Sequence, residues 1–434
     1  MSFVKNSFYT LISNIIIIIF GFLTSVIISR TLGPQLQGVY NLAILMPTMM
    51  YNFLNFGQDV SIIYFLSNKT VDKKQAINNM LPVIIIYSIA STIIGGALIF
   101  ILKERLFNDV AYGTLLLALS ISPLTFFNSV LSGILKSEGK FIVLNKIQVI
   151  NKIIYLGICT ILFIFVNVKV VILANIIILL ISIITIWRRL EIGNIKISFD
   201  KEFQKRNTIY GFKSYLSNMI TYLNYRLDTL IIKALTTTAN VGQYSLAVGL
   251  AEQVWVFSSS ISTVLFPYVS SIEGEKEKSK VTTLTFKIVL VFTLLVIVFL
   301  YLIAAFIIPF LYTEAYEPAI EPFKVLLIGV FLLSLGRILA NDIAARGKPE
   351  LNTVSNIIGL IVNVTLNILL IPSMGITGAA VATSISYTIT SIIFMINFLK
   401  LTRLSIRDLF IFNKSEIEVI KVFISKILKK RVVK

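Results

Sequence analysis

The sequence predicts an all-α protein that crosses a membrane about twelve times. Of its 434 residues, 56% are apolar and 14% are charged, a composition too apolar for an ordinary soluble protein. The apolar residues gather in stretches of roughly 20 residues or more, which is long enough to cross a bilayer. Lys and Arg gather in every second connection between these stretches, as the positive-inside rule describes.

Six apolar stretches precede a polar break at 188–207, and six follow it. The first set lies near 8–29, 39–66, 81–102, 111–135, 141–166 and 170–187. The second set lies near 208–234, 241–272, 281–310, 319–341, 351–371 and 377–400. The stretch at 8–29 is too long for the core of a signal peptide and lacks a small-x-small cleavage site, so it is expected to be a retained span.

The basic connections predict the orientation in the membrane. The side that holds Lys69, Lys73, Lys74, Lys136, Lys140, the polar break, Lys276, Lys278, Lys280, Arg346 and Lys348 is expected to face the cytoplasm, with both termini on that side. The net charge of +18 therefore indicates membrane topology and contact with anionic lipids, and a nucleic-acid partner is not predicted.

The two sets of stretches are related by an internal repeat. Ser13-Asn14 recurs as Ser217-Asn218, Gly38-x-Tyr40-x-Leu42-Ala43 recurs with the same offset from Gly242, and Gly139-Lys140 recurs as Gly347-Lys348. Six spans in each copy make a parallel repeat, whose symmetry axis runs along the membrane normal. We expect an N-terminal lobe at 1–187, a cytoplasmic linker at 188–207, a C-terminal lobe at 208–400 and a basic amphipathic tail at 401–434. A disordered basic tail is the alternative for the last segment.

The seventh stretch carries the strongest candidate site. Asn224, Arg226 and Asp228 lie within otherwise apolar sequence, and charge inside a membrane is costly and usually kept for function. Helical spacing places Asn224 and Asp228 on one face, and Tyr222, Arg226 and Lys233 on the opposite face. A helix that is polar on two faces is expected to face a protein interior or a watery cavity.

Fixed positive charges predict the class of solute. Arg226, Lys233, Lys152 and Arg30 lie in or at the ends of apolar stretches, and such groups form charge-assisted bonds to phosphate oxygens. Asn14 adds a polar group in the first stretch. The alternatives are a structural ion pair for Arg226, a snorkelling end charge for Arg30, and hydrogen bonding between helices for the asparagines.

Other residues limit the chemistry. Histidine is absent and Cys159 is the only cysteine, so a histidine proton relay is excluded, and metal centres and disulfides are not predicted. No phosphate-binding Gly-x-x-x-x-Gly-Lys-Ser/Thr loop occurs, which argues against direct driving by ATP. Asp59, beside predicted interruptions at Pro47 and Gly57, could meet a cation, and Glu252 and Asp342 could bind a coupling proton or Na⁺ or cap a helix end.

Several segments, taken in order, resemble a known family. They are Ser29-Arg30-Thr31-Leu32-Gly33-Pro34, Asn224-Tyr225-Arg226-Leu227-Asp228, Val241-Gly242-x-Tyr244-Ser245-Leu246-Ala247, Phe266-Pro267-Tyr268, Arg346-Gly347-Lys348-Pro349 and Ile371-Pro372-x-x-Gly375-Ile376-x-Gly378-Ala379-Ala380. With these segments the chain resembles a Wzx-type polysaccharide flippase of the multidrug/oligosaccharidyl-lipid/polysaccharide (MOP) exporter superfamily, up to about residue 400.

The resemblance implies two six-helix lobes around a central cavity, in a MATE-like fold, and a transporter rather than an enzyme. The substrate it implies is an undecaprenyl-diphosphate-linked oligosaccharide, moved to the outer leaflet of the bacterial plasma membrane for capsule, O-antigen or exopolysaccharide synthesis. A polysaccharide polymerase and a chain-length regulator would be partners. Relatives use proton or Na⁺ gradients, and in this chain Asp59, Asp228, Glu252 or Asp342 would have to respond to the coupling ion. No other cofactor is expected.

Three other functions stay open. A lipid II flippase would share the fold and the need for phosphate recognition. A MATE-type antiporter of cationic drugs fits poorly, because the predicted cavity is itself cationic. A membrane polysaccharide polymerase or glycosyltransferase would usually carry a long extramembrane loop with catalytic residues, and no connection here is much longer than about 15 residues.

Overall fold

The computed structural model describes residues 3–161, 167–192 and 196–412, and the regular secondary structure of these residues is helical throughout. Eight of the described helical stretches are long and apolar enough to cross a membrane by length and composition. The predicted all-α membrane fold is therefore confirmed. Most of the predicted tail lies outside the described residues, because the description ends at Phe412.

Two helices are too long for one crossing and contain a glycine kink. Helix α1 (Phe3–Leu54) has φ 66° and ψ 173° at Gly33, and α13 (Pro349–Thr402) has φ 57° and ψ −139° at Gly375. These backbone angles are available to glycine and strained for other residues. At 52 and 54 residues, each helix has more than twice the roughly 20 residues that one crossing requires, so each corresponds to two predicted spans.

The second predicted span is interrupted once rather than twice. The α1 helix continues through Pro47 and ends at Leu54. Gly57, in the left-handed conformation with φ 72°, then precedes α2 (Gln58–Ser67). The predicted interruption at Gly57 is confirmed, and the one at Pro47 is wrong, since a proline can be accommodated in a membrane helix by local adjustment.

The remaining helices follow the predicted stretches, with shifted ends. They are α3 (Lys73–Leu106), α4 (Tyr112–Leu119), α5 (Ile121–Ser137), α6 (Phe141–Ile161), α7 (Val168–Leu190), α8 (Lys201–Leu235), α9 (Thr238–Glu252), α10 (Trp255–Ser271), α11 (Glu275–Tyr312), the 3₁₀ turn η2 (Glu314–Ala319), α12 (Ile320–Ala345) and α14 (Ile406–Phe410). The polar break is shorter than predicted. Asp200 caps α8 by accepting hydrogen bonds from two backbone N–H groups, so this helix begins seven residues before the apolar stretch.

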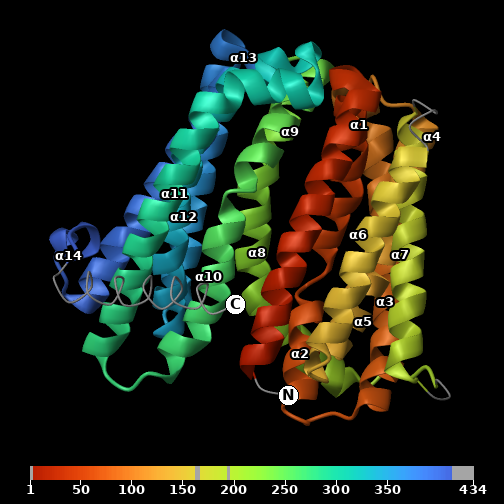
Figure 1. Ribbon diagram of the computed structural model, residues 1–434. Helices are drawn as coiled ribbons and strands as arrows, with labels where there is room; N and C mark the ends of the chain where they lie inside the picture. Colours follow the sequence, from red (N-terminus) through yellow and green to blue (C-terminus); the bar gives the residue numbers. More distant parts are fainter. Residues whose placement is uncertain (1–2, 162–166, 193–195, 413–434) are drawn as a thin grey trace, which may run out of the picture. The chain divides into compact units, whose positions relative to one another are not determined.

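By packing, the chain divides into two compact units. Unit 1 comprises Met1–Leu250, Ala304–Lys324 and Leu360–Thr383, and unit 2 comprises Ala251–Ile303, Val325–Gly359 and Ser384–Lys434. Unit 1 holds α8 together with the first set of spans because α8 contacts α1, α2 and α3. Within this unit α6 lies beside α1 (Figure 1). The two lobes of six helices follow the sequence repeat instead, and they stay a prediction.

A reciprocal contact inside unit 1 reflects the repeat. A methyl group added at Gly38 would lie 1.9 Å from the carbonyl oxygen of Thr238, and one added at Gly242 would lie 2.0 Å from that of Pro34. Gly38 and Gly242 are equivalent in the repeat, and so are Pro34 and Thr238. Each copy thus presents the same patch to the other, as two-fold pseudo-symmetry requires.

A second pair of equivalent elements is the turns after α5 and α12. The N–H groups of Glu138, Gly139 and Lys140 donate to the carbonyls of Ile134, Lys136 and Leu135. Those of Arg346, Gly347 and Lys348 donate to the carbonyls of Asp342, Ala344 and Ile343 in the same pattern. Both glycines have positive φ, as in a glycine-terminated helix.

These two turns, which we call the matched turns, carry ion pairs of opposite polarity. In unit 1, Glu138 accepts from Lys73, the first residue of α3, at 2.8 Å. In unit 2, Arg346 donates to Glu275, the first residue of α11. The residue before the glycine is therefore acidic in the first copy and basic in the second. Its ion-pair partner on the neighbouring helix is basic in the first copy and acidic in the second.

Candidate functional site

Asp228 lies deep in unit 1, as its position in α8 predicts. Its side chain is 2% exposed. The hydroxyl of Tyr244, from α9, donates to Oδ2 at 2.7 Å, and the backbone N–H of Thr229 donates to Oδ1 at 2.7 Å. Both carboxylate oxygens are thus held by fixed donors, which a charged group inside a membrane protein requires.

Three residues of α13 extend this arrangement. The Tyr244 hydroxyl lies 3.1 Å from Oγ1 of Thr383, and the Asn363 amide donates to the same oxygen at 3.1 Å. Asn367 in turn donates to Oδ1 of Asn363 at 3.0 Å. Tyr244, Thr383, Asn363 and Asn367 are each at most 1% exposed. We call these residues and Asp228 the Asp228 cluster.

The Asp228 cluster is rich in oxygen donors. It brings together one carboxylate, two hydroxyl oxygens and two amide oxygens. Oδ1 of Asn367 is buried and accepts no hydrogen bond from the described residues. Hard cations prefer oxygen ligands of these kinds, and a buried carboxylate can alternatively take up a proton. The cluster therefore offers groups of the kinds that Na⁺ or a proton would require, and ion coupling at Asp228 remains a prediction.

The other predicted residues of α8 lie around Asp228. Asn224 is 4% exposed, one helical turn before Asp228. Tyr222 and Arg226 are half-buried, and the Tyr222 hydroxyl lies 2.9 Å from Oγ1 of Thr48 on α1. Helix α8 thus carries a guanidinium and a phenol close in sequence to the buried carboxylate, and the phenol faces α1.

The remaining predicted cations lie in separate surroundings. Lys233 is 6% exposed and bonds both Asp109 and Thr238 at 2.7 Å. Arg30 is exposed and donates to the carbonyl of Phe310 at 3.1 Å. Lys152 is half-buried on α6, with its ammonium 5.9 Å from the ring centre of Tyr155. Asn14 is half-buried on α1.

Lys233 has its charge balanced by an ion pair with Asp109. Hydrogen bonds from Lys233 and Thr238 hold the pKa of the Asp109 carboxyl below its usual range. Asp109 lies in the connection between α3 and α4, outside the helices. An ion pair that joins this connection to α8 provides a structural role for Lys233, and its role in binding a substrate remains a prediction.

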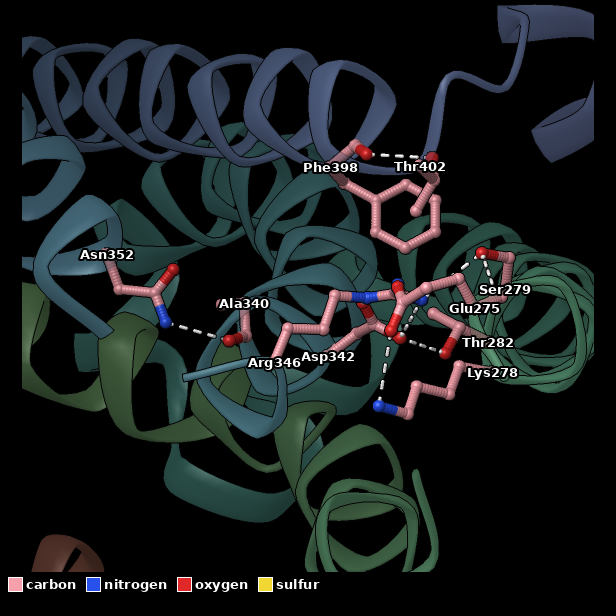
Figure 2. Close-up of polar contacts among 10 residues, drawn as sticks. All are labelled: Glu275, Lys278, Ser279, Thr282, Ala340, Asp342, Arg346, Asn352, Phe398 and Thr402. Carbon is pink, nitrogen blue, oxygen red and sulfur yellow. Dashed lines mark hydrogen bonds and ion pairs between the residues drawn. The ribbon is translucent and has the colours of Figure 1, made fainter. Parts of the chain in front are cut away.

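Three further acids were predicted as candidates for ion coupling. Asp59 lies on the first turn of α2 and accepts from Asn55 at 2.7 Å. Glu252 is the last residue of α9, where the eighth predicted span breaks before α10. Asp342 is fully buried near the end of α12, where Thr282 donates to it at 2.5 Å and Arg346 forms an ion pair with it (Figure 2). These contacts favour the helix-end role for Asp342.

Sequence reasoning missed two cations inside apolar stretches. The guanidinium carbon of Arg337, on α12, lies 4.0 Å from the ring centre of Trp255. Lys287, on α11, is 1% exposed, with its ammonium 5.6 Å from the ring centre of Phe412. Lys287 is the single charged residue of its predicted stretch, and a search for single charges rather than polar clusters would have found it, whereas Arg337 shares its stretch with Glu321 and Lys324.

The comparisons with known proteins agree with this architecture. The family model described as "Polysaccharide biosynthesis protein" matches residues 3–273. A putative O-antigen transporter of Shigella flexneri is 24% identical over 405 residues, covering 89% of this chain and 95% of that protein. Capsular polysaccharide biosynthesis protein CapF of Staphylococcus aureus is 23% identical over 395 residues, covering 88% and 96%.

Solved structures show the same fold. The lipid II flippase MurJ, in an inward closed conformation, superposes with a TM-score of 0.76 at 16% identity, covering 98% of this chain and 99% of that one. An inward-facing multidrug resistance MATE transporter of the MOP superfamily superposes with a TM-score of 0.73 at 16% identity, covering 88% and 94%. At such identities the likeness concerns the fold alone.

Proposed function

Because the chain belongs to the polysaccharide biosynthesis protein family, we propose that it flips undecaprenyl-diphosphate-linked oligosaccharide repeat units from the cytoplasmic to the outer leaflet of a bacterial plasma membrane. Relatives described as an O-antigen transporter and a capsular polysaccharide biosynthesis protein support this substrate class along nearly their whole length. The Shigella flexneri protein and the two solved structures are described as transporters or a flippase, in keeping with a role other than catalysis.

One observation carries the mechanism: helix α8 holds both a buried carboxylate, Asp228, and a half-buried arginine two residues earlier, Arg226. Arg226 would bind the diphosphate, because a guanidinium offers two parallel N–H donors to phosphate oxygens. Tyr222 and Asn224 would contact sugar hydroxyls or phosphate from the same helix. Arg30, Lys152, Lys233 and Asn14 would belong to the same path as further polar groups.

The Asp228 cluster would couple transport to an ion. Tyr244 joins the carboxylate on α8 to Thr383 on α13, so loading the cluster with Na⁺ or a proton changes the charge that links two helices of unit 1. A change of this kind shifts the balance between conformations only if the ion binds them with different affinity. Asp59, Glu252 and Asp342 are the other proposed coupling positions.

The first experiment tests the substrate and the direction of movement. The gene is deleted, lipid-linked oligosaccharides are quantified by mass spectrometry, and an impermeant sugar-oxidising reagent is applied to intact spheroplasts. Single repeat units protected from the reagent are expected. Accumulation on the accessible side would indicate a polymerase, and accumulation of lipid II a lipid II flippase. No accumulation would indicate a drug antiporter.

A second experiment separates ion coupling from substrate binding. Asp228→Asn keeps the shape of the side chain and removes its charge, and Arg226→Lys keeps the charge and removes the planar fork. Transport by purified protein in vesicles is measured under a Na⁺ gradient and under a pH gradient. Asp228→Asn should abolish the response to one gradient while lipid-linked substrate still binds. An unchanged response would remove Asp228 from the coupling mechanism.

A further inference from the structure

Unit 2 contains a cavity that the proposed transport does not use. It measures about 360 Å³ and is lined by Glu275, Lys276, Ser279, Lys280, Thr283, Thr402, Leu404 and Asp408. One wall is the first two turns of α11, and the other is the end of α13 with the start of α14. Figure 2 shows Glu275 and Ser279 of the first wall near Thr402 of the second.

The two carboxylates of this cavity are already engaged within the protein. Glu275 forms ion pairs with Arg346 and with Lys278. Asp408 accepts from the backbone N–H of Ser405 at 2.8 Å and from its hydroxyl at 2.9 Å, in the capping box of α14. Neither carboxylate therefore needs a ligand to balance its charge.

The two lysines of the cavity lack such partners. Lys276 and Lys280 are exposed and lie one turn apart on α11, and in the described part of the chain neither ammonium forms an ion pair. The first N–H groups of α11 lie on the same turns, have no partner inside the helix, and favour an anion through the helix dipole. The two lysines that line the cavity thus suit phosphate.

The exposed apolar residues around this cavity favour a position near the lipid headgroups. Two to four turns further along α11, Ile288, Val291 and Leu295 are 42%, 43% and 65% exposed, as expected for a lipid-facing surface. On α14, Leu409 is fully buried and Ile406 and Phe410 are 53% and 46% exposed. Phe410 also contacts Phe286 of α11 at 5.5 Å between ring centres. A short helix docked in this manner is typical of a segment that lies in the membrane interface.

We propose that this cavity binds the phosphodiester headgroup of an anionic phospholipid, with Lys276 and Lys280 contacting the phosphate. The acyl chains would run along the exposed apolar face of α11. The volume lies within the range of small-molecule sites. The bound lipid would hold α14 against α11 and fix the depth of unit 2 in the leaflet. This lipid is distinct from the transported one and is recognised by a different unit.

The test compares two double variants of equal charge in the full-length protein. Lys276→Gln/Lys280→Gln removes the lysines of the cavity. Lys348→Gln/Lys400→Gln removes two other exposed lysines of unit 2, one just before α13 and one in its last turn, neither of which lines the cavity. Binding of dioctanoyl phosphatidylglycerol and dioctanoyl phosphatidylcholine to each purified protein is measured by native mass spectrometry.

The wild-type protein and the Lys348→Gln/Lys400→Gln variant should retain phosphatidylglycerol more tightly than phosphatidylcholine. The Lys276→Gln/Lys280→Gln variant should lose about 10- to 30-fold in affinity for phosphatidylglycerol, from two lost charge contacts. Equal losses in both variants would mean diffuse attraction to a basic surface and would overturn the proposal.

Inorganic phosphate is the second arm of the test. Because the site is proposed to need both headgroup and acyl chains, phosphate at millimolar concentration should not displace the lipid. Displacement that depends on Lys276 and Lys280 would assign the cavity to a soluble anion instead. The wild-type rate of oligosaccharide transport is measured separately, so a failure of the flippase proposal would not be mistaken for a failure of lipid binding.

Discussion

Replacing Gly242 by alanine tests the contact between the two copies of the repeat. The new methyl carbon would lie 2.0 Å from the carbonyl oxygen of Pro34, whereas carbon and oxygen in favourable contact are about 3.3 Å apart. The neighbouring backbone would have to move by roughly 1.3 Å, because the carbonyl of Pro34 belongs to helix α1 and cannot rotate away as a side chain can. Overpacking of this kind costs about 1–3 kcal/mol.

The matched control is Gly249→Ala, on the same helix α9. A methyl group there meets no atom within 4 Å, so the substitution should leave stability unchanged or raise it by up to about 1 kcal/mol through helix propensity. Gly38→Ala should behave like Gly242→Ala, since its methyl carbon would lie 1.9 Å from the carbonyl oxygen of Thr238.

The assay is thermal unfolding in detergent, followed by the fluorescence of Trp187 and Trp255, together with export in cells. Gly38→Ala and Gly242→Ala should each unfold at a lower temperature than wild type and export less oligosaccharide. If both unfold at the same temperature as Gly249→Ala, the close approach of the two copies does not contribute to stability and the reasoning is refuted.

Three further predictions concern polar contacts. Tyr244→Phe removes the donor to the buried Asp228 carboxylate and should cost about 1–3 kcal/mol of unfolding free energy, measured by denaturation in detergent; an unchanged stability would show that another donor replaces the hydroxyl. Because the folded-state pKa of Asp109 is lowered, the stabilisation from its pair with Lys233 is present above the usual carboxyl pKa and is lost as pH falls through the folded value. Below about pH 4, thermal stability should therefore fall more steeply in wild type than in Asp109→Asn, and equal slopes would contradict this. Lys73→Glu or Glu138→Lys alone should destabilise by at most about 1 kcal/mol, and the double variant should recover part of that loss in the same unfolding assay; a double variant as unstable as the sum of the singles would rule out their pairing.

The spans could be predicted from the sequence because their signal is local. An apolar stretch of the right length has few alternatives in a membrane, and the glycines at positions 33, 57 and 375 mark breaks through their own backbone freedom. The helix starts could be predicted less well. Asp200 extends α8 into the polar break by capping it, and this depends on geometry around one residue rather than on average hydropathy.

The candidate site could be predicted only in part. Asp228 and Arg226 stand out because a charge inside a membrane segment is rare. The neighbours of Asp228 could not be assigned, because Tyr244, Thr383 and Asn363 come from other helices and are brought together by packing. The charge of Lys233 is as conspicuous in the sequence as that of Arg226, but its partner could not be predicted. That partner, Asp109, lies in a connection more than a hundred residues earlier in the chain.

The matched turns bear on how the two halves of the chain can change over time. The backbone pattern of each turn is the same, and the signs of its charges are opposite, so a residue copied from one half to the equivalent position of the other would meet a like charge across the helices. Exchange of residues between the halves is therefore expected to be tolerated when both members of an ion pair are exchanged together, and to be destabilising when only one member is exchanged. An ancestral gene duplication would in this way become progressively harder to recognise from individual residues, even while the hydrogen bonds that define the turn remain the same.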